Sequence, residues 1–211
     1  MKTIDLHGIT HLESVWGGTD EWYWSTDDIH GDLYEAEELF RMGHPVQSNR
    51  LYLIHYPDGR VYEPVPAVAG QYLGYPVYDN GAVALLVVNF PEGILRILRF
   101  RPGATSEVAQ LSLSAVKDCY NLRLRTSPLT LTCSPGDNTF EIVWPEQVRF
   151  AIVERETMNF RDGGKLYFTA WHEDPDYREE TIVRALRDGT ILDRFPGAIR
   201  IMPNGEKWLV T

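Results

Sequence analysis

Cysteine is scarce in this sequence, which contains only Cys119 and Cys133 in its 211 residues. The two do not form a CxxC pair, and this argues against a structural zinc site. Both stand in apolar or β-like surroundings, so we expect two buried, reduced thiols in a cytoplasmic protein. The alternative is a disulfide between them.

Long apolar runs are also missing. The longest covers residues 82–88, far short of the roughly 18 apolar residues that a transmembrane helix needs. The first eight residues lack the apolar stretch of a signal peptide. We therefore expect a cytoplasmic protein without a membrane partner.

Positive charge is deficient, with 20 Lys and Arg against 30 Asp and Glu and a net charge of −10. A nucleic-acid partner requires a basic surface that displaces counterions from phosphates, and no Lys/Arg-rich run is present. An anionic membrane surface is disfavoured for the same reason. The expected partner is another protein, a small molecule or a glycan.

Local catalytic signatures are absent: the sequence has no GxSxG, HExxH, P-loop or GxGxxG pattern. This absence favours a non-enzymatic binding or interaction module without a cofactor. The alternative is a carbohydrate-active hydrolase or sugar-binding protein. The two carboxylates of a glycosidase come from distant strands and leave no local motif.

Short strand signals are what the sequence has in abundance. They are β-branched or aromatic, and turns containing Gly, Asn or Pro separate them. Only residues 33–41 are rich in helix formers, and the 13 prolines argue against long helices. The predicted strands cover residues 51–56, 82–90, 94–100, 108–113, 122–125, 129–133, 140–144, 148–153, 166–171, 181–186, 190–194, 199–202 and 207–210.

A strand–turn–strand cell recurs along the chain. Its clearest copy joins residues 199–202 and 207–210 through Pro203-Asn204-Gly205-Glu206, and a similar cell turns at Pro57-Asp58-Gly59-Arg60. Residues 23–32 also align with residues 167–176. Continued along the chain, the same alignment places the helix-like segment 33–41 opposite a predicted strand. These spacings indicate units of roughly 40–50 residues, the size of a four-stranded propeller blade.

The cells at residues 202–209 and 56–60 resemble the strand turns of β-propeller blades of the broad TolB/WD40-like kind. The combined Gly-His and Trp-Asp signature of WD40 blades is missing, because the sequence has no Trp-Asp pair. The resemblance implies one all-β domain, residues 1–211, with four or five antiparallel blades; the alternative is a β-sandwich or an open meander. It carries no functional residues, because propellers host many functions.

Ring closure depends on the last strand. Strand 207–210 is apolar, and we expect it to pair with the N-terminal blade and close the ring. If closure is incomplete, an exposed edge strand favours a homodimer.

Polar residues gather in two segments that the alignment places at equivalent positions. Carboxylates beside an imidazole could bind a divalent metal, but the spacing matches no EF-hand. Solvated turns explain both segments without a metal, so we expect no metal site. Because the two loops are equivalent, we expect them on the same face of the protein, where they are candidates for ligand binding. Their candidate residues are Asp27, Asp28 and His30 in the first segment, and Trp171, His172 and Asp174 in the second.

An aromatic cluster lies just before the first of these loops and consists of Trp16, Trp22, Tyr23 and Trp24. In a strand, Trp22 and Trp24 point to the same face. If that face is exposed, the two indoles form a platform on which a sugar ring can stack. The alternative is that both pack into the core.

Overall fold

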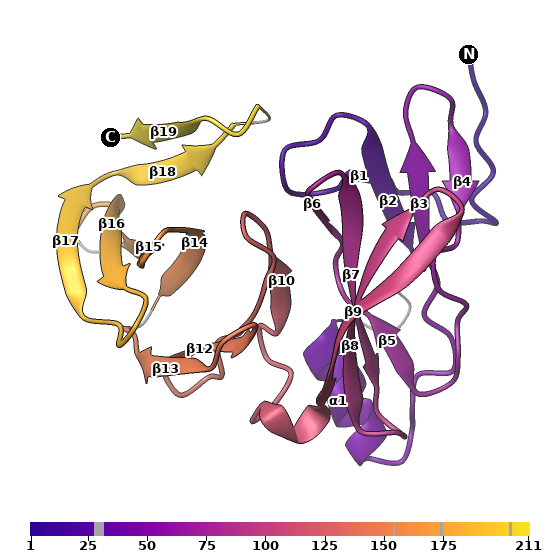
Figure 1. The fold of residues 1–211 in the computed structure, drawn as a ribbon, viewed down its shortest axis with the longest axis horizontal. Helices are drawn as coiled ribbons and strands as arrows, with labels where there is room; N and C mark the ends of the chain where they lie inside the picture. Colours follow the sequence, from indigo (N-terminus) through magenta and orange to yellow (C-terminus); the bar gives the residue numbers. More distant parts are fainter. Residues whose placement is uncertain (28–31, 154, 174, 203) are drawn as a thin grey trace.

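The computed structural model describes residues 1–27, 32–153, 155–173, 175–202 and 204–211, and strands dominate it. Four small antiparallel sheets follow one another along the chain and are arranged in a propeller-like ring (Figure 1). This arrangement confirms the expected propeller-like fold of four or five blades over the sandwich, and four is the number of blades in the ring. The candidates Asp28, His30 and Asp174 lie outside the described residues.

Each sheet is a meander in which sequence neighbours pair, apart from β6, which joins β7 at the side of the second sheet. The first sheet has β1 (Glu13–Ser14), β2 (Trp22–Thr26), β3 (Leu51–His55) and β4 (Arg60–Tyr62). The second has β5 (Gln71–Leu73), β6 (Val77–Asp79), β7 (Ala82–Asn89), β8 (Ile94–Arg101) and β9 (Ala104–Ser112). The third has β10 (Arg123–Arg125), β11 (Thr130–Cys133), β12 (Thr139–Trp144) and β13 (Val148–Ala151). The fourth has β14 (Glu156–Asp162), β15 (Lys165–His172), β16 (Arg178–Ala185) and β17 (Ile191–Pro196).

Three of the four apolar clusters in the described residues lie between successive sheets, and the fourth lies between the first sheet and the N-terminal segment. Leu53 and Leu85 belong to the cluster between the first and second sheets. Phe140 and Phe168 belong to the cluster between the third and fourth, with ring centroids 5.0 Å apart. Strand β7 is buried along its whole length because it has packed neighbours on both faces, which explains its continuous apolar run.

Helix α1 (Leu33–Arg41) packs with the second and third sheets through Leu33 and Ala36. Asp32 caps its N-terminus by accepting a hydrogen bond from the Glu35 amide, while the Glu35 carboxylate accepts one from the Asp32 amide. The segment aligned with it by sequence is strand β16, so the two segments are not structurally equivalent. The capping box and the helix formers decide the local conformation. A short 3₁₀ turn, η1 (Leu113–Ala115), follows β9.

The C-terminal hairpin consists of β18 (Ala198–Ile201) and β19 (Lys207–Val210), which pair with each other. In the described residues β19 does not pair with the first sheet, so the expected closure through that ladder is wrong. The hairpin instead lies beside the fourth sheet and directs its loop toward the first (Figure 1). None of the described helices is both long and apolar enough to cross a membrane.

Candidate ligand-binding site

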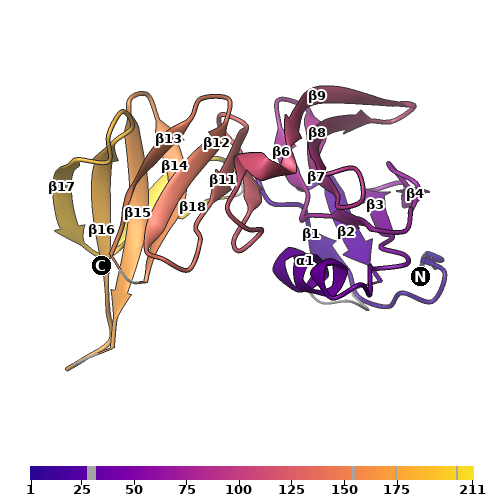
Figure 2. The same cartoon turned by 90° about the horizontal axis from the view of Figure 1, so that it is seen from below.

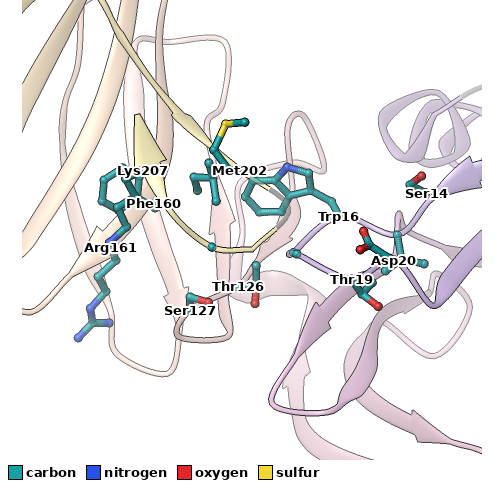
Figure 3. Close-up of a pocket in the computed structure, with 15 residues that line it drawn as sticks. Ser14, Trp16, Thr19, Asp20, Thr126, Ser127, Phe160, Arg161, Met202 and Lys207 are labelled. Carbon is teal, nitrogen blue, oxygen red and sulfur yellow. The ribbon is translucent and has the colours of Figure 1, made fainter. Parts of the chain in front are cut away.

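A cavity of about 310 Å³ lies in the middle of the ring, between the C-terminal hairpin and the loop that joins β1 to β2 (Figure 3). Segments from the first, third and fourth sheets and from the hairpin line it, so it depends on the ring arrangement. Its lining includes Ser14, Trp16, Thr19, Asp20, Thr126, Ser127, Phe160, Arg161, Met202 and Lys207.

Trp16 forms one wall and has 44% of its surface exposed. Its carbonyl accepts a hydrogen bond of 2.7 Å from the Tyr78 amide, which fixes the loop to the second sheet. Gly17, at φ +122°, permits this approach, because a Cβ there would lie 2.4 Å from the Tyr78 carbonyl oxygen. The indole is thus held by backbone contacts and points toward Met202 (Figure 3).

The floor of the cavity is hydrogen-bonded to Tyr78, the residue that also holds the Trp16 loop. The Thr126 hydroxyl donates a hydrogen bond of 2.7 Å to the Tyr78 carbonyl. The Ser127 amide donates to Asp79 Oδ1 at 3.4 Å, and Arg99 pairs with Asp79 Oδ2 at 2.6 Å. Tyr78 and Asp79 therefore lock three sheets together around the cavity.

The opposite wall carries cationic groups that already have partners. Phe160 is buried and stacks on Tyr167, with centroids 4.4 Å apart. The Lys207 ammonium lies 4.4 Å from the centre of the Phe160 ring and 3.5 Å from Asp162. Arg161 forms an ion pair with Glu146. These pairings leave an apolar wall with its positive charge partly neutralised.

The lining supports binding better than acid–base chemistry. It combines an exposed indole, apolar side chains, several hydroxyls and one carboxylate, that of Asp20, among the described lining residues. Glycoside hydrolysis requires two carboxyl groups about 5–9.5 Å apart across the scissile bond. The cavity therefore has the composition of a site that holds a ligand by stacking and hydrogen bonding.

Of the two alternatives for Trp22 and Trp24, the core placement is confirmed and the sugar platform is wrong. Their side chains are 6% and 5% exposed and pack between the first and second sheets, with Trp22 edge-on to Phe100. Alternate residues of β2 face the second sheet, and the two indoles occupy those core positions. Neither offers a free face to a sugar.

The remaining candidates lie away from the cavity and in two different sheets. Asp27 follows β2 and accepts a hydrogen bond of 3.1 Å from the Arg50 amide. On β15, Trp171 packs against the Arg155 guanidinium at 4.3 Å, and His172 lies 3.9 Å from Glu180. The first and fourth sheets stand at opposite ends of the view in Figure 2. In the described part of the chain, no group of three or more His, Cys, Asp and Glu could hold a metal ion.

Trp16 belongs to the aromatic cluster that is visible in the sequence, but its position in a cavity is not visible there. The signal was the glycine pair Gly17-Gly18 directly after the indole, which allows close backbone approach. The contribution of Thr126 and of the hairpin had no local signal, because only the ring brings them beside Trp16.

No protein family matches the sequence, and no curated protein is similar to it. The site itself therefore provides the evidence for a function.

Proposed function

We propose that this protein is a non-enzymatic binding module that holds a small ligand in the cavity at the middle of its ring. The observation that carries the proposal is the exposed Trp16 indole, whose backbone is anchored to the second sheet. The indole faces an apolar wall on the other side of the cavity, which has a volume of about 310 Å³. This volume lies at the lower end of the range typical of small-molecule sites. An already positioned indole also loses little conformational entropy on binding.

A sugar is the ligand class that the lining favours. Carbohydrate rings stack their C–H faces on indole, and their hydroxyls bond to carboxylates and side-chain hydroxyls. Asp20 and Thr19 share the cavity with Trp16, and Ser127 lies across from them. A hydrolase of the same substrates is less well supported, because the described lining offers a single carboxylate.

Charge and cysteine content bear on the partners and the cellular location of the protein. Its net charge of −10 disfavours nucleic acid and anionic membranes as partners. Its two cysteines are free and buried, which supports a reducing, cytoplasmic location.

The proposal is tested by titrating the protein with a panel of mono- and oligosaccharides and following tryptophan fluorescence and thermal shift. We expect Trp16→Ala to weaken binding at least about tenfold, since stacked aromatic residues dominate such contacts. Tyr177→Ala is the matched control, because Tyr177 is exposed in the loop between β15 and β16 and does not line the cavity. Equal loss in both variants, or no saccharide bound by the parent chain, would count against the proposal.

A substitution at Asp20 tests whether the cavity binds a neutral sugar or a cationic ligand. Asp20→Asn keeps the shape of the side chain and removes its charge, so a neutral sugar should lose only a few-fold in affinity. A cationic ligand would instead lose much of its affinity. A panel of neutral sugars and organic cations with this variant distinguishes the two ligand classes.

A further inference from the structure

The C-terminal hairpin has an open edge. In the described residues it is the one sheet with two strands, whereas the others have four or five. Strand β19 pairs with β18 on one side, and Figure 1 shows no strand beyond it on the other. An edge of this kind presents a row of unpaired N–H and C=O groups that can accept another strand.

The register identifies the backbone groups that point outward. The Met202 amide donates to the Glu206 carbonyl at 2.8 Å, so these two residues form a hydrogen-bonded pair. Hydrogen-bonded and non-hydrogen-bonded pairs alternate along an antiparallel ladder. Trp208 therefore bonds to β18, while the backbone groups of Lys207 and Leu209 point away from it.

The side chains on this edge are apolar and exposed. Trp208, Leu209 and Val210 have 54%, 49% and 52% of their surfaces exposed. Proteins usually protect such an edge with charges, particularly lysine. The lysine here, Lys207, lies over its own chain's Phe160 and beside Asp162, so it gives the edge little protection.

We propose that β19 pairs antiparallel with β19 of a second copy of this chain, about a two-fold axis at Trp208. Lys207 then exchanges two backbone hydrogen bonds with the partner subunit's Leu209, and Leu209 does the same with the partner subunit's Lys207. Trp208 stands opposite the partner subunit's Trp208 in a non-hydrogen-bonded pair, where side chains approach most closely. The result is a four-stranded sheet, the strand number of the first, third and fourth sheets.

A second copy fits this edge better than an unrelated strand because the segment is complementary to itself. Residues 207–210 contain no acidic side chain, so the contact does not place carboxylates opposite each other despite the net charge of −10. The Trp208 indole is also fixed, because its Nε1 donates to Glu206 at 3.1 Å. Four residues per copy make a small interface, and interfaces below about 1,200 Å² are typical of transient complexes. The dimer is therefore weak and depends on concentration.

Cysteine cross-linking tests both the contact and its register. Oxidation of Trp208→Cys should give a disulfide-linked dimer, because the two new thiols face each other at the axis. Val210→Cys is the matched control, since its two copies would lie roughly 14 Å apart along the strands. Native Cys119 and Cys133 are buried and do not compete. Equal cross-linking of both variants, or none with Trp208→Cys, overturns the proposal.

Sedimentation over a concentration series tests the association without a cross-link. The parent chain should show a monomer–dimer equilibrium that Leu209→Pro weakens at least tenfold, because proline removes an outward N–H and spares the ladder to β18. Val68→Lys alters an equally exposed apolar residue elsewhere and should leave the equilibrium unchanged. A parent chain that stays monomeric throughout, or dimers that survive Leu209→Pro, overturns the proposal. Circular dichroism verifies that each variant is folded.

Discussion

At the scale of single residues, burial decides the chemistry of the two thiols. Burial raises the pKa of Cys133 to about 12, and it raises the pKa of Cys119 still further above its ordinary value. The sequence suggested buried thiols or a disulfide, and the structure has both cysteines free and buried. Their surroundings come from distant segments, so the sequence alone could not decide between the two.

These thiols should react very slowly with a thiol reagent in the folded protein. Only the thiolate reacts, and a raised pKa leaves almost none of it at pH 8. The reaction should become fast in denaturant, where both groups regain an ordinary pKa and access to solvent. A reagent that releases a coloured thiolate on reaction measures the two rates, since the absorbance is followed with and without denaturant. Rapid modification of the native protein would contradict the buried placement.

The pair of Arg184 and Glu156 is a second case where single residues matter. Both side chains are buried, Arg184 Nη2 donates to Glu156 at 2.8 Å, and Arg184 Nη1 donates to the Gly189 carbonyl at 2.8 Å. We expect Arg184→Met to lower the free energy of unfolding by about 3–5 kcal/mol, because it leaves a buried carboxylate without its partner.

Chemical denaturation measures that loss, and Arg194→Met provides the control. Arg194 pairs with Glu180 in a solvent-exposed position, where an ion pair contributes at most about 1 kcal/mol. The double variant of Arg184→Met with Glu156→Leu should recover part of the lost stability, since it removes both buried charges. Equal losses from Arg184→Met and Arg194→Met would show that the buried pair is not special.

At the scale of elements, the sequence predicted strands well and their faces poorly. Alternation in β8, where Leu95 and Ile97 are buried and Arg96 is not, is visible in the sequence. The same alternation placed Trp22 and Trp24 on one face but could not say whether that face was core or surface. Only the second sheet packing against β2 decides this, and that contact is distant in sequence.

The loop between β1 and β2 is the element on which the cavity wall depends. Gly17→Ala should displace it, because the added Cβ would lie 2.4 Å from the Tyr78 carbonyl in a backbone conformation that favours glycine. We expect a loss of more than about 1 kcal/mol in stability and a larger proportional loss of ligand affinity. Denaturation and titration measure the two effects.

Gly103→Ala is the control for that experiment. Gly103 also has a positive φ, but nothing lies within 4 Å of a Cβ placed there. It should therefore lose stability from backbone strain alone and keep its ligand affinity. If Gly17→Ala binds ligand as well as Gly103→Ala does, the loop does not position Trp16.

At the scale of the whole molecule, the recurring strand–turn–strand cells predicted a propeller with four or five blades. The ring has four full sheets and a two-stranded hairpin, so the last cell forms only part of a blade. A hairpin signal states that two strands pair, but it does not state how many strands join them. The cavity escaped prediction for the same reason, since the ring brings its walls together from across the chain.

The C-terminal hairpin should contribute little to the stability of the fold but should be required for ligand binding and self-association. Its residues belong to none of the described apolar clusters, and its ion pairs, Arg200 with Glu179 and Lys207 with Asp162, are partly exposed to solvent. Deleting residues 198–211 should lower the melting temperature by only a few degrees, because the cores between the four sheets remain intact. The same deletion removes the Met202 and Lys207 side of the cavity and the whole β19 edge.

Ligand binding and self-association should thus both disappear while unfolding stays cooperative. Calorimetry, saccharide titration and sedimentation of the shortened chain measure the three properties. Loss of cooperative unfolding would mean that the hairpin is part of the core. Ligand affinity equal to that of the full chain would instead place the binding site away from the ring centre, because no cavity can hold a ligand equally well after losing a wall.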